Sequence, residues 1–179
     1  WGADRDQVTS LITMTAEDAH VFATSIFETL RVARASLTRD EATELLTRAC
    51  LQEWISTLPD GIDTPIGSGG TTVSGGERRR LLMARALAAP APMMAIDEAS
   101  EHLDATTADR LMDTLLTPSP SRATLVVTHR LSALDKADHV LVLAAPQPGA
   151  CASVAAYGTH TDVLNALPTY RQALDQEEQ

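Results

Sequence analysis

A short apolar run that ends in two adjacent acids constrains the fold of this chain more than any other feature. Residues 93–96 are Met-Met-Ala-Ile, and Asp97 and Glu98 follow them directly. The run is too short for a helix and is typical of a strand buried on both faces. Apolar runs at residues 124–128 and 140–143 are expected to form two further buried strands, and a helical pattern at residues 105–116 separates the first two of the three runs. The sequence therefore predicts an α/β fold with a parallel sheet flanked by helices.

Helical periodicity covers much of the remaining chain. We expect another short buried strand at residues 11–16 and a mildly helical tail from Gly158 onward. The expected helices span residues 25–35, 40–49 with Asp40 as the N-cap, 51–58, 77–89 and 105–116. A loop of small residues, 67–76, leads into the fourth of them.

The charge balance bears on the class of function. Acids outnumber bases 24 to 14, and the resulting formal charge of −10 argues against a nucleic-acid-binding surface. Lys136 is the only lysine among these bases. The two cysteines, Cys50 and Cys151, are far apart and fit a reducing compartment better than a disulfide framework. No apolar run approaches the roughly 18 residues that span a bilayer, so we expect a soluble, cytoplasmic chain.

The segment Val73-Ser74-Gly75-Gly76-Glu77 stands immediately before a predicted helix. Free backbone N–H groups at a helix start, together with the positive end of the helix dipole, form an anion site. Glycines let a phosphate approach the backbone closely, and the Ser74 hydroxyl adds a donor. A flexible loop with an ordinary serine N-cap explains the same residues, and for this segment alone that simpler interpretation is favoured.

Asp97, Glu98 and His129 follow two of the predicted strands. Side chains at the carboxyl edge of a parallel sheet face the crevice in which such proteins bind ligands. One carboxylate can hold Mg²⁺ through water while its neighbour orients or deprotonates an attacking water. A neutral imidazole at His129 can contact a terminal phosphate. Each residue also has a purely structural explanation, as a surface acid or as a histidine that simply ends a strand.

In their order and spacing these segments resemble the motifs of the ATP-binding cassette family of ATPases. Residues 73–77 are similar to the family's signature motif, and residues 78–87 to the helix that follows it. Residues 93–98 resemble the Walker B strand. Residues 100–104 resemble the D-loop, which crosses the dimer interface, and residues 128–130 resemble the loop of the switch histidine.

The resemblance implies ATP and Mg²⁺ as cofactors. It implies that Asp97 is the magnesium-associated acid, Glu98 the catalytic base and His129 the contact to the γ-phosphate. Residues 16–26 resemble the Q-loop of exporter-type members, with Glu17 in place of the glutamine that contacts Mg²⁺. The resemblance also implies residues that bind the ATP of a partner domain. They are the signature residues Ser74, Gly75, Gly76 and Glu77 and the D-loop aspartate, Asp104.

The resemblance also divides the chain into three parts. Residues 1–23 would end an N-terminal core with the Q-loop, 24–90 would form a helical subdomain with the signature motif, and 91–179 the ATPase core. The family's phosphate loop, G-x-x-x-x-G-K-[ST], is not in this sequence, because no glycine loop precedes Lys136. We interpret the chain as a partial cassette of the P-loop NTPase type, whose phosphate loop belongs to a preceding segment.

These residues predict the nucleotide-binding domain of an exporter that hydrolyses ATP at a dimer interface when complete and is inactive as this isolated chain. A second nucleotide-binding domain, identical or different, and a transmembrane domain are the implied partners, at the cytoplasmic face of the membrane. Residues 17–22 and 67–80 are most similar to the cysteine/glutathione exporter linked to cytochrome bd assembly.

Two alternatives remain open from the sequence. The chain could be a non-hydrolysing module that only donates its signature face to a partner. It could also be a soluble cassette ATPase of DNA repair or translation. The net charge of −10 and the exporter-like Gly158-Thr159-His160 count against the second alternative.

Overall fold

The structure is a computed structural model that describes residues 4–15, 19–67, 72–101, 103–117, 119, 121–144 and 151–177. The chain divides into two compact units, Trp1–Thr128 and His129–Gln179. None of the helices in the described residues is long and apolar enough to cross a membrane.

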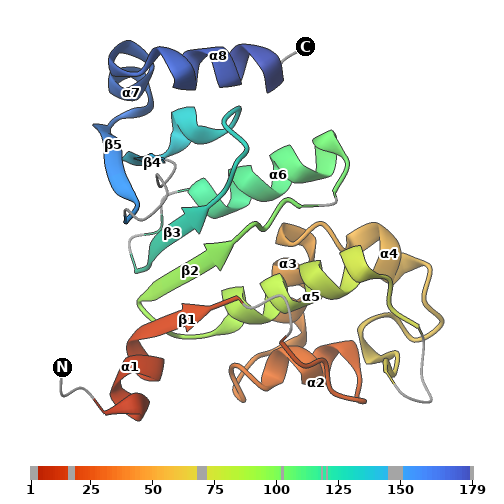
Figure 1. Cartoon of the computed structure of the whole chain (residues 1–179). Helices are drawn as coiled ribbons and strands as arrows, with labels where there is room; N and C mark the ends of the chain where they lie inside the picture. The colour runs from red at the N-terminus through yellow and green to blue at the C-terminus, as the bar shows by residue number, and fades with distance from the viewer. Residues whose placement is uncertain are drawn as a thin grey trace. The chain divides into compact units, whose positions relative to one another are not determined.

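A three-stranded parallel sheet forms the centre of the first unit (Figure 1). Strand β2 (Met93–Asp97) lies between β1 (Ile12–Met14) and β3 (Ala123–Val127). The register pairs Ala95 with Met14 on one side and with Leu125 on the other. These pairings confirm the parallel sheet that the apolar runs predicted.

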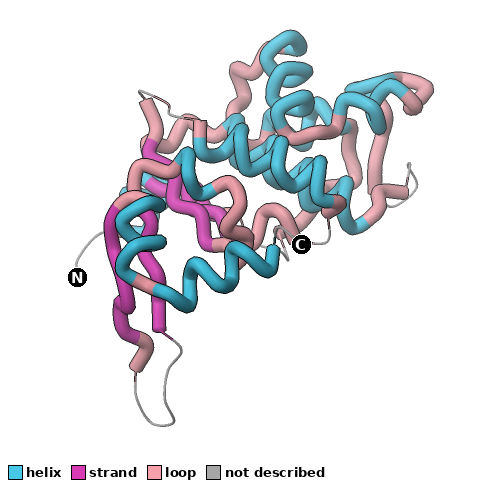
Figure 2. The backbone as a smooth tube through the Cα atoms, turned by 90° about the horizontal axis from the view of Figure 1, so that it is seen from above, coloured by secondary structure: helices cyan, strands magenta, loops and turns pink. Residues whose placement is uncertain are grey.

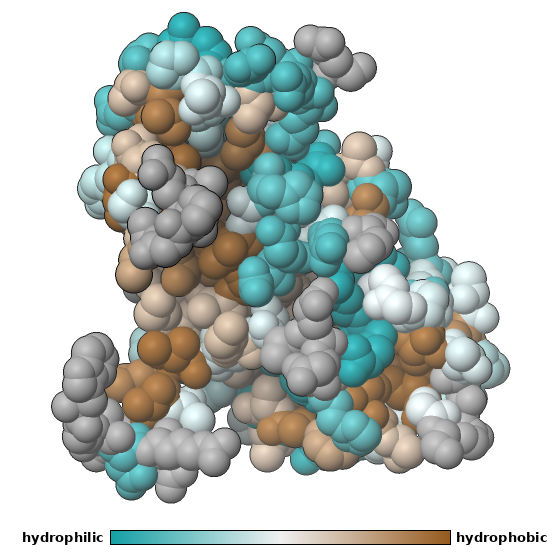
Figure 3. Space-filling model, viewed as in Figure 1, coloured by the Kyte–Doolittle hydropathy of each residue, from teal (hydrophilic) through white to brown (hydrophobic). Residues whose placement is uncertain are grey.

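The two faces of this sheet differ in burial. Met94 and Ile96 of β2 are 2% and 1% exposed. On the opposite face Met14, Leu125 and Val127 are 67%, 52% and 53% exposed, and Figure 3 shows apolar surface over β1. Burial was therefore expected correctly for the centre of β2 and wrongly for β1 and β3. The reason is that, among the described residues, each outer strand pairs with β2 alone and carries apolar side chains on an uncovered face.

Helices make up the rest of the first unit. α2, α3 and α4 gather at one side of it, away from β1 and β3 (Figures 1 and 2), and both α2 and α3 pack against α5. α1, which precedes β1, was not predicted. The helices of this unit are α1 (Arg5–Leu11), α2 (Ile26–Arg31), α3 (Arg39–Arg48), α4 (Gln52–Ser56), α5 (Gly75–Ala88) and α6 (Ala105–Leu116), with a 3₁₀ turn at Gly61–Asp63.

The N-cap of α3 is Thr38 and not Asp40 as expected. The Thr38 hydroxyl accepts a hydrogen bond from the backbone N–H of Glu41, and the Glu41 carboxylate accepts one from the backbone N–H of Thr38. This reciprocal capping box satisfies two backbone donors at once. Asp40 lies in the first turn instead, where its charge is still favourable.

The second unit contains a two-stranded antiparallel sheet. β4 (Val140–Ala144) pairs with β5 (Ser153–Gly158), a strand that was not predicted, and the expectation that residues 140–143 join the parallel sheet is wrong. Helices α7 (His160–Ala166) and α8 (Pro168–Glu177) follow, after a 3₁₀ turn at Leu134–Lys136. Val140, Val163 and Tyr170 form the buried core of this unit.

Candidate functional site

The signature segment forms the start of α5, which begins two residues earlier than expected. Ser74 is the N-cap, and its hydroxyl oxygen accepts a hydrogen bond from the backbone N–H of Glu77 at 3.3 Å. The Glu77 carboxylate accepts one from the backbone N–H of Ser74 at 2.8 Å. Since the hydroxyl uses only its oxygen in this capping box, its hydrogen can be donated to another group.

The packing of the described residues leaves room for a larger side chain at Gly75 and Gly76. Among the described residues, a Cβ built at Gly75 meets no atom within 4 Å, and one at Gly76 meets the Arg80 guanidinium at 3.6 Å and Leu103 at 3.9 Å. Neither glycine has a positive φ. Glycine inside a helix is less stable than alanine by roughly 0.5–1 kcal/mol. The two glycines therefore fit a role outside the fold, such as the close approach of an anion to the start of α5.

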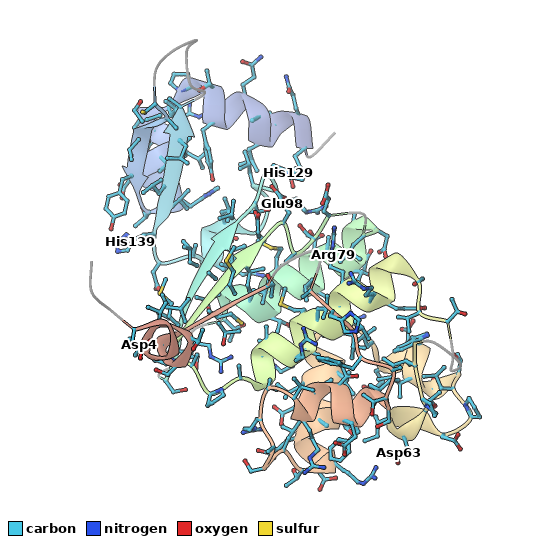
Figure 4. All side chains as sticks on the ribbon, turned by 60° about the horizontal axis from the view of Figure 1, so that its bottom comes forward. Asp4, Asp63, Arg79, Glu98, His129 and His139 are labelled. Atoms are coloured by element: carbon cyan, nitrogen blue, oxygen red, sulfur yellow. The ribbon has the colours of Figure 1, made fainter. Side chains whose placement is uncertain are left out.

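Asp97 and Glu98 stand at the carboxyl end of β2, and Figure 4 labels Glu98 at this place. Asp97 is exposed. Glu98 has a φ of 47°, one of two positive values among the described non-glycine residues. A left-handed backbone costs a non-glycine residue about 1–2 kcal/mol, and such strain is concentrated at functional sites. The strained turn at Glu98 is thus a signal that the sequence pattern did not contain.

The donor set at this place suits Mg²⁺. No group of three or more His, Cys, Asp or Glu side chains within the described residues could hold a metal ion. Mg²⁺, however, is usually held by one or two protein carboxylates together with substrate phosphates and water. Asp97 and its neighbour Glu98 meet that requirement. Glu17, the other predicted magnesium ligand, lies outside the described residues.

The D-loop segment is attached to both neighbouring helices. Arg79 of α5 donates hydrogen bonds to the backbone carbonyl and the carboxylate of Glu101, at 3.0 and 3.2 Å. Asp104 is the N-cap of α6 and accepts a hydrogen bond from the backbone N–H of Thr107 at 2.9 Å. Hydrogen bonding to Thr107 lowers the pKa of Asp104, and the charge of Arg80 lowers it further.

Ala19 and His20, which belong to the predicted Q-loop, are also held by α5. Arg78 donates to the carbonyl of Ala19 at 2.6 Å, and Arg85 donates to the carbonyl of His20 at 2.8 Å. Burial lowers the pKa of the Arg85 guanidinium, and the charge of Arg78 lowers it further. A groove of about 590 Å³ opens beside these contacts; the residues lining it include Met14, Phe22, Val32, Leu82, Arg85 and Ala86. No sequence motif predicted this groove, because its lining comes from separate segments.

His129 is the first residue of the second unit, two positions after the end of β3, and its side chain is exposed. Within the first unit, Asp97 and Glu98 are neighbours in the sequence and lie together at the end of β2. The N-cap and first turn of α5 contain Ser74, Gly75, Gly76 and Glu77.

The chain has clear relatives among known proteins. The family model described as "ABC transporter" matches residues 3–101. The "Mitochondrial potassium channel ATP-binding subunit" of Rattus norvegicus is 35% identical over 176 residues, which cover 96% of this chain and 23% of that protein. The "ATP-dependent lipid A-core flippase" of Burkholderia pseudomallei (strain 1710b) is 39% identical over 132 residues, or 74% of this chain and 22% of that protein. The chain thus spans about a quarter of the length of these curated relatives.

A solved structure shares the fold over nearly the whole chain. It is a bacterial Atm1-family ABC exporter with ATP bound, with a TM-score of 0.79 and 27% sequence identity. The similarity covers 97% of this chain and 30% of that one. The parallel sheet with flanking helices is therefore the fold of this class of ATPase.

Proposed function

Because the chain belongs to the ABC transporter family, we propose that it forms most of the nucleotide-binding domain of an ATP-driven exporter. The start of α5 carries this proposal. A Cβ built at Gly75 meets no atom of the described residues within 4 Å, and this space would let a phosphate approach the backbone at the helix start. We propose that Gly75 and Gly76 hold, with Ser74 and Glu77, the phosphates of ATP bound to a second nucleotide-binding domain.

The other predicted residues complete the chemistry in this proposal. Bound Mg²⁺ would neutralise charge on the transferred phosphoryl group. Asp97 would hold the ion, with Glu17 as a nearby carboxylate. Glu98 would orient the attacking water and accept its proton. His129 would hydrogen-bond to the γ-phosphate. Such catalysis consists mainly of positioning and charge stabilisation, which fixed side chains on a sheet edge can supply.

The second domain would contact this one through two segments of the first unit. One is the start of α5, and the other is the D-loop, where Asp104 would face the second domain. The contact between Arg79 and Glu101 supports this, because it keeps both segments in one fixed arrangement. We retain the division into residues 1–23, 24–90 and 91–179 as part of the proposal.

The groove beside α5 fits the transmembrane domain as its occupant. Its lining is mostly apolar, and Phe22 in it is 45% exposed. An amphipathic helix can bury its apolar face in such a groove. Arg85, which lines the groove, also lies on the helix that begins at the signature residues. Docking there would therefore place the exporter's membrane part against the nucleotide-binding helix, at the cytoplasmic face of the membrane.

The identity of the exported molecule is the most specific part of the proposal. The similarity of residues 17–22 and 67–80 to a cysteine/glutathione exporter is its only support, and the curated relatives named above carry other descriptions. Inside-out vesicles containing the full-length protein should accumulate labelled cysteine or glutathione when ATP is supplied. Uptake of neither compound by vesicles that hydrolyse ATP would leave the exporter assignment intact and remove this substrate.

The ATPase assignment is tested in the full-length protein. Glu98→Gln should abolish ATP turnover while ATP binding persists, because the amide cannot accept a proton. Glu53→Gln, which changes an exposed acid on α4, is the matched control and should hydrolyse ATP normally. Undiminished hydrolysis by Glu98→Gln would remove Glu98 from its role.

The non-hydrolysing alternative predicts a different result. A signature donor alone would show no turnover in the full-length protein but would accelerate hydrolysis by a partner subunit. The purified 179-residue chain should be inactive under both proposals, since its only lysine, Lys136, is not in a phosphate loop.

A further inference from the structure

The groove beside α5 leaves large apolar side chains open to solvent. Met14 of β1, Phe22 and Val32 line it and are 67%, 45% and 59% exposed. Leu82 and Ala86 of α5 line it too, and both are buried. The described lining residues all belong to the first unit, so the groove lies within one compact unit. Its apolar surface is of the kind that an amphipathic helix buries.

Arg85 gives this groove a positive charge. Among the described residues that line the groove there is no Asp, Glu or Lys, and Arg85 is the one with a permanent charge. Its guanidinium donates to the carbonyl of His20 at 2.8 Å, its one hydrogen bond within the described part of the chain. A guanidinium has five N–H groups, so donors remain for an outside group. Burial and the charge of Arg78 lower the pKa of Arg85, and a carboxylate beside it would relieve this unfavourable charge.

Positive charge is also present at the end of the groove that follows α5. Ala89 and Ala91 line that end, and the Arg122 guanidinium donates hydrogen bonds to both of their carbonyls. Burial lowers the pKa of Arg122, and the charges of Arg48 and Arg34 lower it further. The whole chain has a formal charge of −10, so positive charge around this groove is opposite to its overall balance. The surface that complements the groove is therefore apolar and acidic.

We propose that the groove binds an amphipathic helix of the transmembrane domain that carries an aspartate or glutamate opposite Arg85; this inference rests on the proposed function, in which that domain docks here. The carboxylate would accept hydrogen bonds from the guanidinium, whose planar fork matches a carboxylate. Apolar side chains three or four residues from the acid lie on the same helix face and would cover Phe22 and Val32. Arg85 thus determines which segment the groove accepts.

The loss of water around Arg85 explains this selectivity. A helix with only apolar side chains would remove water from the guanidinium without replacing its hydrogen bonds, and a basic helix would add repulsion. An acidic side chain avoids both costs. Because the guanidinium is partly buried, salt screens the pair less than it screens an ion pair on the open surface. The charge therefore selects the partner, while the apolar side chains supply the buried area.

Photo-cross-linking in the full-length protein identifies the occupant of the groove. The photoreactive residue p-benzoylphenylalanine in place of Phe22 keeps an aromatic side chain at an exposed position of the lining. After irradiation, the attached peptide should come from a helix of the transmembrane domain. It should contain an aspartate or glutamate within about two helical turns, or roughly seven residues, of the attachment point.

Three substitutions at Arg85 separate the effect of its charge from that of its shape. Arg85→Glu should lower the cross-linking yield about tenfold, because the proposed pair becomes repulsive. Arg85→Gln keeps a donor for the His20 carbonyl without the charge and should lower the yield about threefold. Arg85→Lys keeps the charge and should lower it by less than about twofold. Arg110→Glu, at an exposed position of α6 outside the lining, is the matched control and should give the wild-type yield.

Reversal of both charges completes the test. An arginine in place of the identified acid should lower the yield as Arg85→Glu does, and the two changes together should restore at least about half of the wild-type yield. A restored yield also requires that both variants fold, so it separates a lost ion pair from a lost fold.

The outcomes distinguish this inference from the proposed function. Attachment to a transmembrane-domain helix without such an acid, or a double reversal that restores nothing, would overturn the inference and leave docking in the groove intact. Equal losses in Arg85→Gln and Arg85→Lys would show that the shape of the arginine matters and not its charge, which would also overturn it. Attachment to no part of the transmembrane domain would reject the docking site and the inference together. The ATPase assignment is tested separately by Glu98→Gln.

Discussion

The backbone N–H of Glu98 donates a hydrogen bond to the carbonyl of Val127 at 2.9 Å. This contact continues the pairing of β2 with β3 one residue past Asp97, before the φ of 47° at Glu98 turns the chain away from the sheet. The proposed catalytic side chain thus sits on the one residue where a regular strand becomes a strained turn. Its backbone is held by the neighbouring strand, so the strain does not relax.

We expect the strain at Glu98 to be measurable. Glu98→Gly should be more stable than Glu98→Ala by about 1 kcal/mol, because glycine adopts a left-handed backbone without steric cost. Both variants remove the carboxylate, so both should lack ATP turnover in the full-length protein. Thermal or urea unfolding gives the difference. Equal stability of the two variants would contradict the strained backbone.

Because there is room for a methyl group at Gly75, we expect a substitution there to affect ATP turnover without lowering the stability of the fold. Gly75→Ala should leave the stability unchanged or raise it by up to about 1 kcal/mol, since the new methyl group meets no atom in the part of the chain that the structure describes and alanine favours helix. The same variant should lose ATP turnover in the full-length protein, because the methyl group would occupy the approach of the phosphate.

Gly61 provides the matched control for this prediction. A Cβ there also meets no atom of the described residues within 4 Å, but the φ of Gly61 is 52°. Gly61→Ala should therefore lower the stability by about 1 kcal/mol and leave turnover unchanged. An unstable Gly75→Ala would show that Gly75 serves the fold. An inactive Gly61→Ala would show that turnover responds to a loss of stability at a remote turn and not to the approach of the phosphate.

Arg122 is expected to matter for stability through its shape as well as its charge. Its guanidinium donates to the backbone carbonyls of Leu87, Ala89 and Ala91 at the end of α5 and beyond it. A lysine ammonium cannot reproduce this fork, so Arg122→Lys should destabilise the chain by about 2 kcal/mol. Arg110→Lys, at an exposed position of α6, should change the stability little. Urea unfolding of the two variants checks the prediction.

The stability should fall in acid partly through Asp104. Hydrogen bonding to Thr107 lowers the pKa of this carboxyl below its ordinary value of 3.8. Its stabilising effect is therefore complete above the unfolded pKa and is lost as the pH falls through the lower, folded value. Melting temperatures between roughly pH 2 and 6 should show the decline.

Asp104→Asn supplies the control for this pH dependence. Asparagine still caps a helix but does not titrate in this range, so the decline should become shallower. It should not vanish, because the pKa values of Glu41, Asp63 and Asp162 are also lowered. An unchanged pH profile for Asp104→Asn would contradict the role of this carboxylate.

The sequence predicted those features that depend on neighbouring residues. α6 was predicted at its observed bounds, because its helical periodicity is a local property of the sequence. The pairing of β4 was wrong, since an apolar run does not reveal whether its partner strand is parallel or antiparallel. The cap of α3 was missed because Thr38 and Asp40 are both good capping residues, and the reciprocal contact of Glu41 favours Thr38.

The candidate site shows the same difference between local features, which could be predicted, and long-range contacts, which could not. The motif residues Ser74, Asp97 and Glu98 could be named from order and spacing. The contacts between α5 and the segment at Ala19, separated by 59 residues, could not, because only the folded chain brings them together.

Several arginine side chains in the described part of the chain hold backbone oxygen atoms. Arg78, Arg85 and Arg122 each donate to main-chain carbonyls far away in the sequence, and Arg79 donates to the carbonyl of Glu101. A carbonyl is present whatever side chain its residue carries. The attached segments can therefore change their side chains during evolution, for instance to suit a different membrane partner, while the arginines keep them in place. Selection would then act on the few arginine positions and leave the surfaces that they hold free to diverge.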